Sequence, residues 1–221
     1  MAVWIAHLGL VLVVAYLFGS IPTGYWAGLL LKGIDIREHG SKSTGATNVL
    51  RTLGKVPAIV VLLIDILKGT AAVVFARWFY GLPSAALPNA VTLTDWMPWM
   101  ITLAALMAIL GHSRSIWIRF TGGKSAATGL GVLLAMCWPV GLGILLVFGL
   151  VLAISRIVSL GSMAAAVAAT VLMWAFGQPL AFQLTALLGG LFVIWRHQAN
   201  IQRLIAGTEP RLGQQSSDVP G

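Results

Sequence analysis

One segment decides the fold: Ser125–Ser155, with the sequence SAATGLGVLLAMCWPVGLGILLVFGLVLAIS. It contains no charged residue, and Trp138-Pro139 and several glycines lie near its middle. Proline interrupts a helix, so the segment forms either one long kinked helix or two short helices that turn near Pro139. One long helix would give the chain six membrane spans, and two would give seven.

The composition of the 221 residues is that of an integral membrane protein. Hydrophobic residues make up 58% of the chain and charged residues only 9%, against about 25% charged residues in soluble domains. A span needs roughly 20 apolar residues, and the first run has no basic start or cleavage site, so we expect it to be retained. Outside Ser125–Ser155, the candidate spans are Val3–Leu31, Val56–Phe79, Met97–Leu110, Leu160–Phe176 and Leu180–Trp195.

The distribution of Lys and Arg chooses between six spans and seven. With seven, twelve of the 14 basic residues lie on one side of the membrane, and only Lys68 and Arg77 do not. With six spans, eight basic residues lie on one side of the membrane and five on the other. Because basic loops stay in the cytoplasm, we predict an all-α polytopic membrane protein with seven transmembrane helices, an outside N-terminus and a cytoplasmic C-terminus.

The same features limit the functions that the chain can have. The net charge of +8 comes from short loops between apolar runs, which suits anionic lipid headgroups and a phosphorylated substrate rather than nucleic acid. The single cysteine, Cys137, excludes a disulfide framework, and no metal-ligand spacing is present, so we expect no metal or cofactor. We expect one membrane domain over residues 1–209, an outside loop at Gly81–Trp96 and a disordered tail at residues 210–221.

A polar run, Gly40-Ser-Lys-Ser-Thr-Gly-Ala-Thr-Asn48, interrupts this apolar sequence and is followed by Arg51 and Lys55. Glycines let backbone N–H groups approach an anion, hydroxyls add donors, and Arg supplies a planar charged fork. The run is either a phosphate cradle or a solvated basic loop. The spacing of its glycines favours the cradle.

Three further polar clusters are predicted on the cytoplasmic side or within a span. Gly122-Gly123-Lys124 precedes an apolar helix, and a helix N-terminus with a nearby Lys favours a phosphate, although the P-loop spacing is absent. Asp65 and Lys68 are three residues apart, and a structural ion pair is favoured over direct chemistry. The last cluster extends from Trp195 to Glu209 and contains His197 and Asn200. Three residues have structural alternatives. His112 is as readily an interfacial residue as a catalytic one, and Ser159 and Ser162 lie at the start of a span, where serines are more often packing contacts.

In order along the chain, six motifs resemble those of the acyl-phosphate:glycerol-3-phosphate acyltransferases, a family of small bacterial membrane enzymes. The chain departs from the family pattern at Lys42-Ser43-Thr44 and at Arg114-Ser115. The motifs are GSIPTG (Gly19–Gly24), GS...GATN..R (Gly40–Arg51), D..KG (Asp65–Gly69), GH...F.GGK..AT (Gly111–Thr128), SLGS (Ser159–Ser162) and H..NI.RL..G.E (His197–Glu209).

The resemblance implies an enzyme of the bacterial plasma membrane that transfers a fatty acyl group from acyl phosphate to the 1-hydroxyl of sn-glycerol 3-phosphate. It implies seven helices and a cytoplasmic active site, which agrees with the charge distribution. The residues implied to hold glycerol 3-phosphate are Ser41, Arg51, Lys124, His197 and Asn200. Those implied or expected to hold the phosphate of acyl phosphate are Gly45, Ala46, Thr47, Asn48, Gly122, Gly123, Ser159 and Ser162.

The residues that are missing suggest how such an enzyme would work. The chain has no His-x4-Asp dyad, no Gly-x-Ser-x-Gly elbow and no paired carboxylates. Acyl phosphate is already activated, so we expect direct attack by glycerol 3-phosphate, with the proton passing to a substrate phosphate or to His197. A phosphate or glycerol-phosphate transporter is the main alternative, and a non-catalytic membrane subunit is the other.

Overall fold

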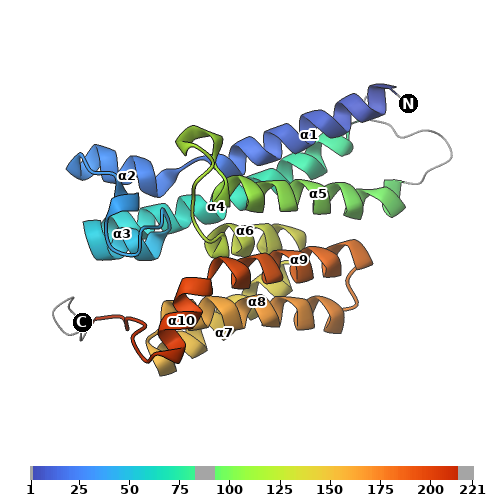
Figure 1. Ribbon diagram of the computed structural model, residues 1–221. Coiled ribbons are helices and arrows are strands. Elements are labelled where there is room, and N and C mark those ends of the chain that lie inside the picture. Colours follow the sequence, from blue (N-terminus) through green and yellow to red (C-terminus); the bar gives the residue numbers. More distant parts are fainter. Residues whose placement is uncertain (1, 83–92, 214–221) are drawn as a thin grey trace.

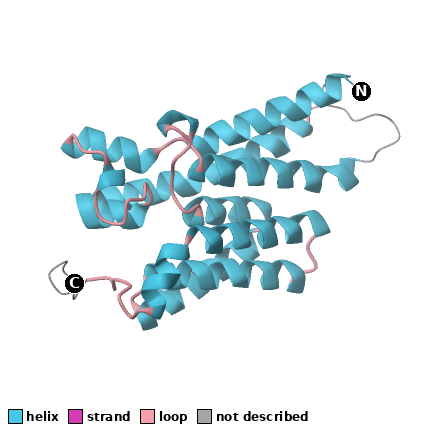
Figure 2. Ribbon diagram, viewed as in Figure 1, coloured by secondary structure: helices cyan, strands magenta, loops and turns pink. Residues whose placement is uncertain are grey.

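The computed structural model describes residues 2–82 and 93–213, which form helices joined by short loops (Figures 1 and 2). Two of the loops contain a single 3-10 turn, η1 (Ile36–Glu38) and η3 (Ile116–Ile118). The α-helices are α1 (Ala2–Ser20), α2 (Thr23–Lys32), α3 (Ala46–Leu53), α4 (Lys55–Tyr80), α5 (Leu93–Ser113), α6 (Ala126–Met136), α7 (Trp138–Ser155), α8 (Val158–Ala175), α9 (Leu180–Arg196) and α10 (Gln198–Ile205).

The long helices form two layers with α6 between them (Figure 1). Helices α1, α4 and α5 pack together in one layer, and α7, α8 and α9 pack in the other. The contact between α1 and α5 is close because small residues face each other: a Cβ on Gly19 would lie 2.1 Å from the carbonyl oxygen of Ala108. Small residues at such contacts let membrane helices approach closely.

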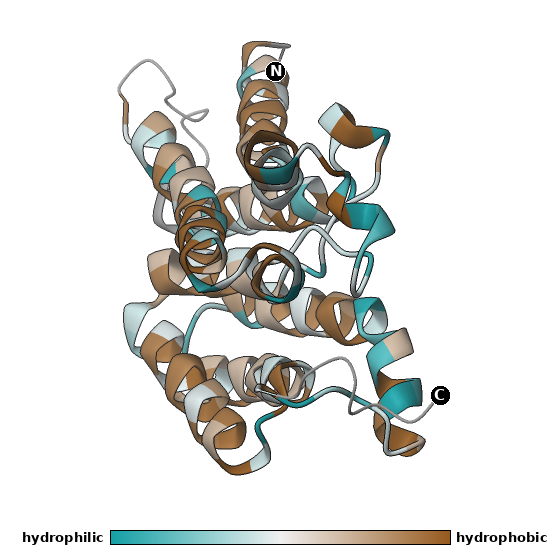
Figure 3. Cartoon of the chain, turned by 90° about the vertical axis from the view of Figure 1, so that its left-hand side faces the viewer, coloured by the Kyte–Doolittle hydropathy of each residue, from teal (hydrophilic) through white to brown (hydrophobic). Residues whose placement is uncertain are grey.

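Large apolar side chains cover the outside of the bundle, as expected for a surface that contacts lipid. Leu30 and Ile154, for example, are 84% and 86% exposed. By length and composition, five helical segments of the described chain suit a membrane span, and a sixth is added if α9 and α10, which are bent by 60°, are taken together. Figure 3 shows hydrophobic ribbon on the long helices and hydrophilic ribbon mainly in loops and short helices.

The segment Ser125–Ser155 forms two helices, so one long kinked helix is wrong. Cys137 has an extended backbone between α6 and α7. A Cβ on Gly141 would lie 2.7 Å from the Cα of Leu134, whereas seven residues of continuous helix would separate them by about 10 Å. The two helices therefore fold back on each other. At 11 residues, α6 is only about 16 Å long, roughly half the thickness of the hydrocarbon core.

The other predicted spans are confirmed as helices, but several of their limits differ. The run Val3–Leu31 is divided at Ile21 and Pro22 into α1 and α2, because proline offers no N–H to continue the helix. Helix α5 extends beyond the predicted Met97–Leu110 at both ends. Most of the predicted outside loop, residues 83–92, lies outside the described residues, as does the tail from residue 214. Within the described part of that tail, Leu212 N donates to Arg156 O (2.7 Å).

The twelve basic residues predicted to share one side of the membrane form four groups, at residues 32–55, 114–124, 156 and 196–211, and the four groups lie at the same end of the bundle (Figure 1). Hydrogen bonds join them. Arg37 Nη1 donates to Thr121 Oγ1 (2.9 Å), and Arg196 Nη2 donates to Gly122 O (3.2 Å). This end, which carries α2, α3, α10 and the loop between α5 and α6, is called the polar end below.

Candidate active site

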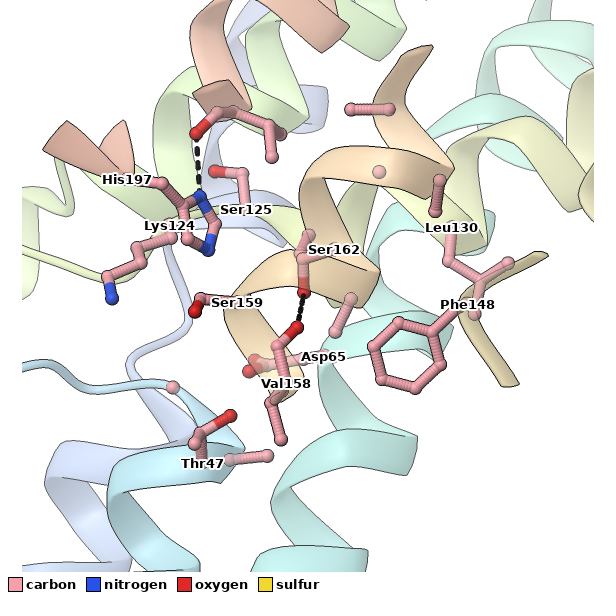
Figure 4. Close-up of a pocket in the computed structure, with 18 of the residues that line it drawn as sticks. Thr47, Asp65, Lys124, Ser125, Leu130, Phe148, Val158, Ser159, Ser162 and His197 are labelled. Atoms are coloured by element: carbon pink, nitrogen blue, oxygen red, sulfur yellow. Dashed lines mark hydrogen bonds between the residues drawn. The ribbon is translucent and has the colours of Figure 1, made fainter. Parts of the chain in front are cut away.

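A cavity of about 260 Å³ opens at the polar end, between the two layers of helices. Its outer part is polar and its inner part is apolar (Figure 4). Eleven of the thirteen predicted site residues line it, although they come from four separate stretches of sequence. They are Ser41, Gly45, Ala46, Thr47, Asn48, Arg51, Lys124, Ser159, Ser162, His197 and Asn200.

Asn48 organises the loop from Gly40 to Arg51. Its side chain is 1% exposed and makes four hydrogen bonds. Its Nδ2 donates to the carbonyl oxygens of Ile36 (3.0 Å), His39 (3.0 Å) and Ser43 (2.8 Å). Its Oδ1 accepts from Ser41 N at 2.7 Å. Asn48 therefore shapes the loop with its side chain, although it also lines the cavity.

The loop leads into the N-terminus of α3, which faces the cavity. Gly45, Ala46 and Thr47 line the wall there. The first N–H groups of a helix have no partner within it, and the helix dipole makes this end partially positive. Gly45 O accepts from Asn48 N and Val49 N, and Gly45 N donates to Ser43 Oγ (3.4 Å), so among the described residues the amides left over at this end are those of Ala46 and Thr47. This geometry suits a phosphate.

Two basic side chains line the polar part of the cavity, and within residues 2–82 and 93–213 neither forms an ion pair with a carboxylate. Arg51 comes from the last turn of α3, and Lys124 comes from the loop before α6. Lys124 Nζ donates to Asn200 Oδ1. Burial lowers the pKa of Lys124 from 10.5 to about 8; Glu209 opposes this shift, while Arg203, Arg51 and Arg196 add to it. A bound dianion would favour the charged form of this lysine and raise its pKa again, which suits a phosphate ligand.

Glu209 fixes the wall opposite α3, and the sequence analysis did not place it in the site. Its Oε1 accepts from Ser159 Oγ (2.7 Å) and Asn200 Nδ2 (2.6 Å), and its Oε2 accepts from Arg203 Nε (2.7 Å). Burial alone would raise the pKa of Glu209, but these bonds outweigh it, and the pKa is lowered. Glu209 is the last residue of the H..NI.RL..G.E motif, and this position could have indicated that it belongs to the site.

His197 lies between α9 and α10 and is 4% exposed. Its Nδ1 is 2.7 Å from Val193 O, and a carbonyl oxygen can only accept, so Nδ1 carries a proton. The other ring nitrogen, Nε2, points into the cavity (Figure 4). When the ring is neutral, Nε2 is an acceptor, which suits a hydroxyl group; when it is protonated, Nε2 donates to a phosphate.

Gly122 and Gly123 do not line the cavity, unlike the other predicted site residues. They pack against His112, where a Cβ on Gly122 would lie 2.2 Å from His112 O and one on Gly123 would lie 2.1 Å from His112 Nε2. Their carbonyl oxygens accept from Arg196, at 3.2–3.3 Å. The double glycine therefore lets the loop pass close to α5, and this placement holds Lys124 at the cavity.

The predicted ion pair of Asp65 and Lys68 is confirmed, with 2.7 Å between Oδ1 and Nζ. Both side chains are buried in α4. Thr23 Oγ1 donates to Asp65 Oδ1 (2.7 Å), and Lys68 Nζ donates to Ile21 O (2.8 Å) at the break between α1 and α2. Asp65 also lines the cavity, which the sequence pattern did not indicate.

The inner part of the cavity is apolar and is formed mainly by α6, α7, α8 and α9. Leu130 and Phe148 face each other there (Figure 4). Two lining residues, Leu62 and Leu145, are 40% and 44% exposed. The cavity therefore combines a polar part, which holds Arg51 and Lys124, with an apolar part that suits an alkyl chain.

Comparison with known proteins gives consistent results. Residues 9–207 match the family model described as glycerol-3-phosphate acyltransferase. The glycerol-3-phosphate acyltransferase of Acaryochloris marina is 57% identical over 219 residues, covering 98% of this chain and 97% of the relative. Glycerol-3-phosphate acyltransferase 2 of Rhizobium johnstonii is 62% identical over 218 residues, covering 97% and 99%.

Two crystal structures of PlsY (YgiH), an integral membrane glycerol 3-phosphate acyltransferase, have the same fold. The glycerol 3-phosphate form aligns with a TM-score of 0.80 at 33% identity, covering 93% of this chain and 96% of that chain. The lysophosphatidic acid form aligns with a TM-score of 0.79 at 34% identity, covering 93% and 95%. The chain thus belongs to the glycerol-3-phosphate acyltransferase family.

Proposed function

We propose that this protein transfers a fatty acyl group from acyl phosphate to the 1-hydroxyl of sn-glycerol 3-phosphate, releasing lysophosphatidate and phosphate. The observation that carries the proposal is the two-part cavity, with Arg51 and Lys124 in its polar part and Leu130 and Phe148 in its apolar part. Lysophosphatidate has the same two parts, a phosphorylated head and one acyl chain.

The polar part of the cavity has enough hydrogen-bond donors to bind two phosphate groups. Ser41, Arg51, Lys124, His197 and Asn200 would hold glycerol 3-phosphate. The N-terminus of α3, over Gly45–Asn48, and the hydroxyls of Ser159 and Ser162 would hold the phosphate of acyl phosphate. Gly122 and Gly123 act indirectly in this proposal, because their role is to place Lys124.

The reaction would be a direct attack of the hydroxyl on the acyl carbon, without an acyl-enzyme. The new ester bond forms as the bond between the acyl carbon and the phosphate oxygen breaks. Holding two reactants in place can lower the barrier by roughly 7–11 kcal/mol. One well-placed donor to the developing negative charge can add about 3–4 kcal/mol. These terms suit a site that supplies position and donors to an already activated acyl group.

We further propose seven membrane crossings, with the N-terminus outside and the polar end in the cytoplasm of a bacterium, and one acyltransferase domain over residues 1–209. The reversal of the chain at Cys137 and the basic segments at the polar end support this topology. To test it, single cysteines would replace Gln178, between α8 and α9, or Thr208, after α10, in a Cys137→Ser background. A membrane-impermeant maleimide should label intact cells at position 178 and not at position 208; the opposite pattern refutes the orientation.

The activity is tested with purified protein, acyl phosphate and labelled glycerol 3-phosphate, by following labelled lysophosphatidate. Acyl-CoA in place of acyl phosphate should give no product; equal product from acyl-CoA would refute the donor. A transporter would instead carry labelled glycerol phosphate into proteoliposomes without forming lipid. The apolar inner end of the cavity is unsuited to such a polar path.

A further inference from the structure

The loop between α5 and α6 begins with a small hairpin that exposes apolar side chains at the polar end (Figure 1, green). The hairpin comprises residues 114–121, and its arms meet where Ser115 N donates to Thr121 O (3.0 Å). Three of its side chains, Ile116, Trp117 and Phe120, are 49%, 59% and 56% exposed. Exposed apolar side chains that gather on one short element mark an interaction surface.

Hydrogen bonds and a buried side chain fix the hairpin in place. Ile118 lies between the exposed residues in sequence but is buried. Ser115 Oγ donates to Ser20 O at the end of α1 (2.5 Å). Arg37 donates through Nη1 to Ile118 O (3.1 Å) and to Thr121 Oγ1 (2.9 Å). The exposed side chains are therefore held outward by the fold and do not belong to a loose loop.

The hairpin also carries two arginines and no acidic residue. Arg114 and Arg119 are exposed, and in the described part of the chain neither forms an ion pair with a carboxylate. Arg119 and Phe120 both have positive φ, 60° and 55°, which is unfavourable for residues with a Cβ. This strained turn keeps a charge and an aromatic ring together at the surface. Such a combination matches a lipid interface, where rings lie at the headgroup level and arginine attracts anionic lipid.

The depth of the hairpin in a membrane follows from α1. Ser20, which accepts the hydrogen bond from the hairpin, is 16 residues after Trp4, about 24 Å along the helix. Trp4 packs against Trp96 at the opposite end of the bundle, with 5.3 Å between ring centroids. The hairpin and this tryptophan pair are thus separated by nearly the thickness of the hydrocarbon core, roughly 30 Å. Because tryptophan is enriched at both interfaces, Trp117 lies where the second interface is expected.

The hairpin adjoins the apolar outer surface of α1 and α2. Tyr16 of α1 donates through its hydroxyl to Arg114 O (2.7 Å). The guanidinium of Arg37, which holds the hairpin, also lies 4.8 Å from the ring centroid of Tyr25 in α2. Leu30, in the same helix, is one of the most exposed apolar residues of the chain. The surface that continues into the hairpin is therefore the one that suits lipid, which favours lipid over a protein partner.

We propose that the hairpin inserts into the lipid interface at the polar end. Its three apolar side chains lie among the acyl chains next to the headgroups, and its two arginines bind the phosphates of anionic lipids. The hairpin leads directly to Gly122-Gly123-Lys124, so its insertion fixes the depth of the cavity opening at the level of the headgroups. A phosphorylated lipid carries its phosphate at this level. The inference goes beyond the proposed function and does not depend on the acyl donor.

The depth is tested with nitroxide labels on single cysteines in a Cys137→Ser background, in vesicles of phosphatidylcholine and phosphatidylglycerol. Trp117→Cys and Phe120→Cys carry the label in the hairpin, and Thr208→Cys is the matched control, exposed at the same end. The hairpin labels should lie about 5–10 Å deep, accessible to oxygen in the bilayer and shielded from a water-soluble nickel chelate. The label at position 208 should be open to the chelate. Hairpin labels that are as open to the chelate as the control would overturn the proposal.

The role of the arginines is tested with a fluorescent label at position 117 and nitroxide-labelled lipids as quenchers. Labelled phosphatidylglycerol should quench more strongly than labelled phosphatidylcholine, because each arginine should enrich the anionic lipid about fivefold. Arg114→Gln with Arg119→Asn should make the two lipids quench alike; asparagine is chosen because it tolerates positive φ. Equal quenching in the protein that keeps both arginines, or a preference that survives in the double variant, would overturn their role. The first comparison needs no charge variant, so it decides even if the double variant does not fold.

Discussion

Raising the pH from 7 to 9 should lower kcat/KM for glycerol 3-phosphate about tenfold, because Lys124 loses its charge in this interval. Burial places the pKa of Lys124 at about 8, below its usual 10.5. The charged form is the one that attracts phosphate, so affinity is present below this pKa and is lost above it. The phosphate of the substrate ionises near pH 6 and stays constant throughout the interval.

The size of the effect follows from the fraction of charged lysine. With a pKa of about 8, roughly nine-tenths of Lys124 is charged at pH 7 and roughly one-tenth at pH 9. The parameter kcat/KM reports the ionisation of the free enzyme. Its logarithm should therefore fall with a slope near −1 above pH 8.

The assay is initial rates across pH 7–10 at low glycerol 3-phosphate and saturating acyl phosphate, with the spontaneous hydrolysis of the donor subtracted. Lys124→Arg is the matched variant, since a guanidinium keeps its charge over this range. Its profile should be flat, even if its activity is lower. A flat profile for the unmodified enzyme, or the same fall in Lys124→Arg, would refute the role given to Lys124.

Three further substitutions test the packing and the site. Gly131→Ala should lower the unfolding free energy by about 1–3 kcal/mol, because the new Cβ would lie 1.9 Å from Ile66 O. The loss is measured as a lower melting temperature. Gly129→Ala is the control and should not lower it, because no atom lies within 4 Å of the new Cβ. Arg51→Ala should raise KM for glycerol 3-phosphate by roughly 10- to 150-fold with kcat retained, the effect of one or more bonds to a charged group, and an unchanged KM would remove Arg51 from that site. Glu209→Gln should raise KM for both substrates, because Ser159 and Asn200 share its carboxylate; normal KM values would contradict that role.

The long helices could be predicted because hydropathy alone marks them. The breaks within them were harder to predict. The run Val3–Leu31 is apolar on both sides of Pro22, so hydropathy shows one span where the backbone breaks into α1 and α2. At Pro139 the sequence left two alternatives, which the extended backbone of Cys137 and the contact of Gly141 with Leu134 distinguish.

The site was predictable to the extent that its motifs are polar segments in an apolar chain. Such segments gather where water or a polar ligand satisfies them, and most of the predicted residues do share one cavity. A motif does not tell which side of a loop faces the ligand, however. Gly122 and Gly123 face His112 instead of the cavity. The spacing of Asp65 and Lys68 predicted their pairing, but the rotation of α4 decides that Asp65 also reaches the cavity.

Arg77 is a basic residue at the end of α4 opposite Lys55, where the distribution of charges predicts few. Its Nη2 donates to Met136 O (2.9 Å), the last carbonyl of α6. The last carbonyls of a helix lack partners within it, and α6 is too short to bring them to the far membrane surface. A cation is also favourable at the negative end of the helix dipole.

The contact of Arg77 with Met136 explains how α6 can stop in an apolar environment. Because α6 stops after 11 residues, the chain can reverse at Cys137 and α7 can return to the polar end. Both helices then contribute to the cavity, with Leu130 from α6 and Phe148 from α7. Arg77 is thus explained by the folding of Ser125–Ser155, and its position does not count against a topology that places the other basic segments in the cytoplasm.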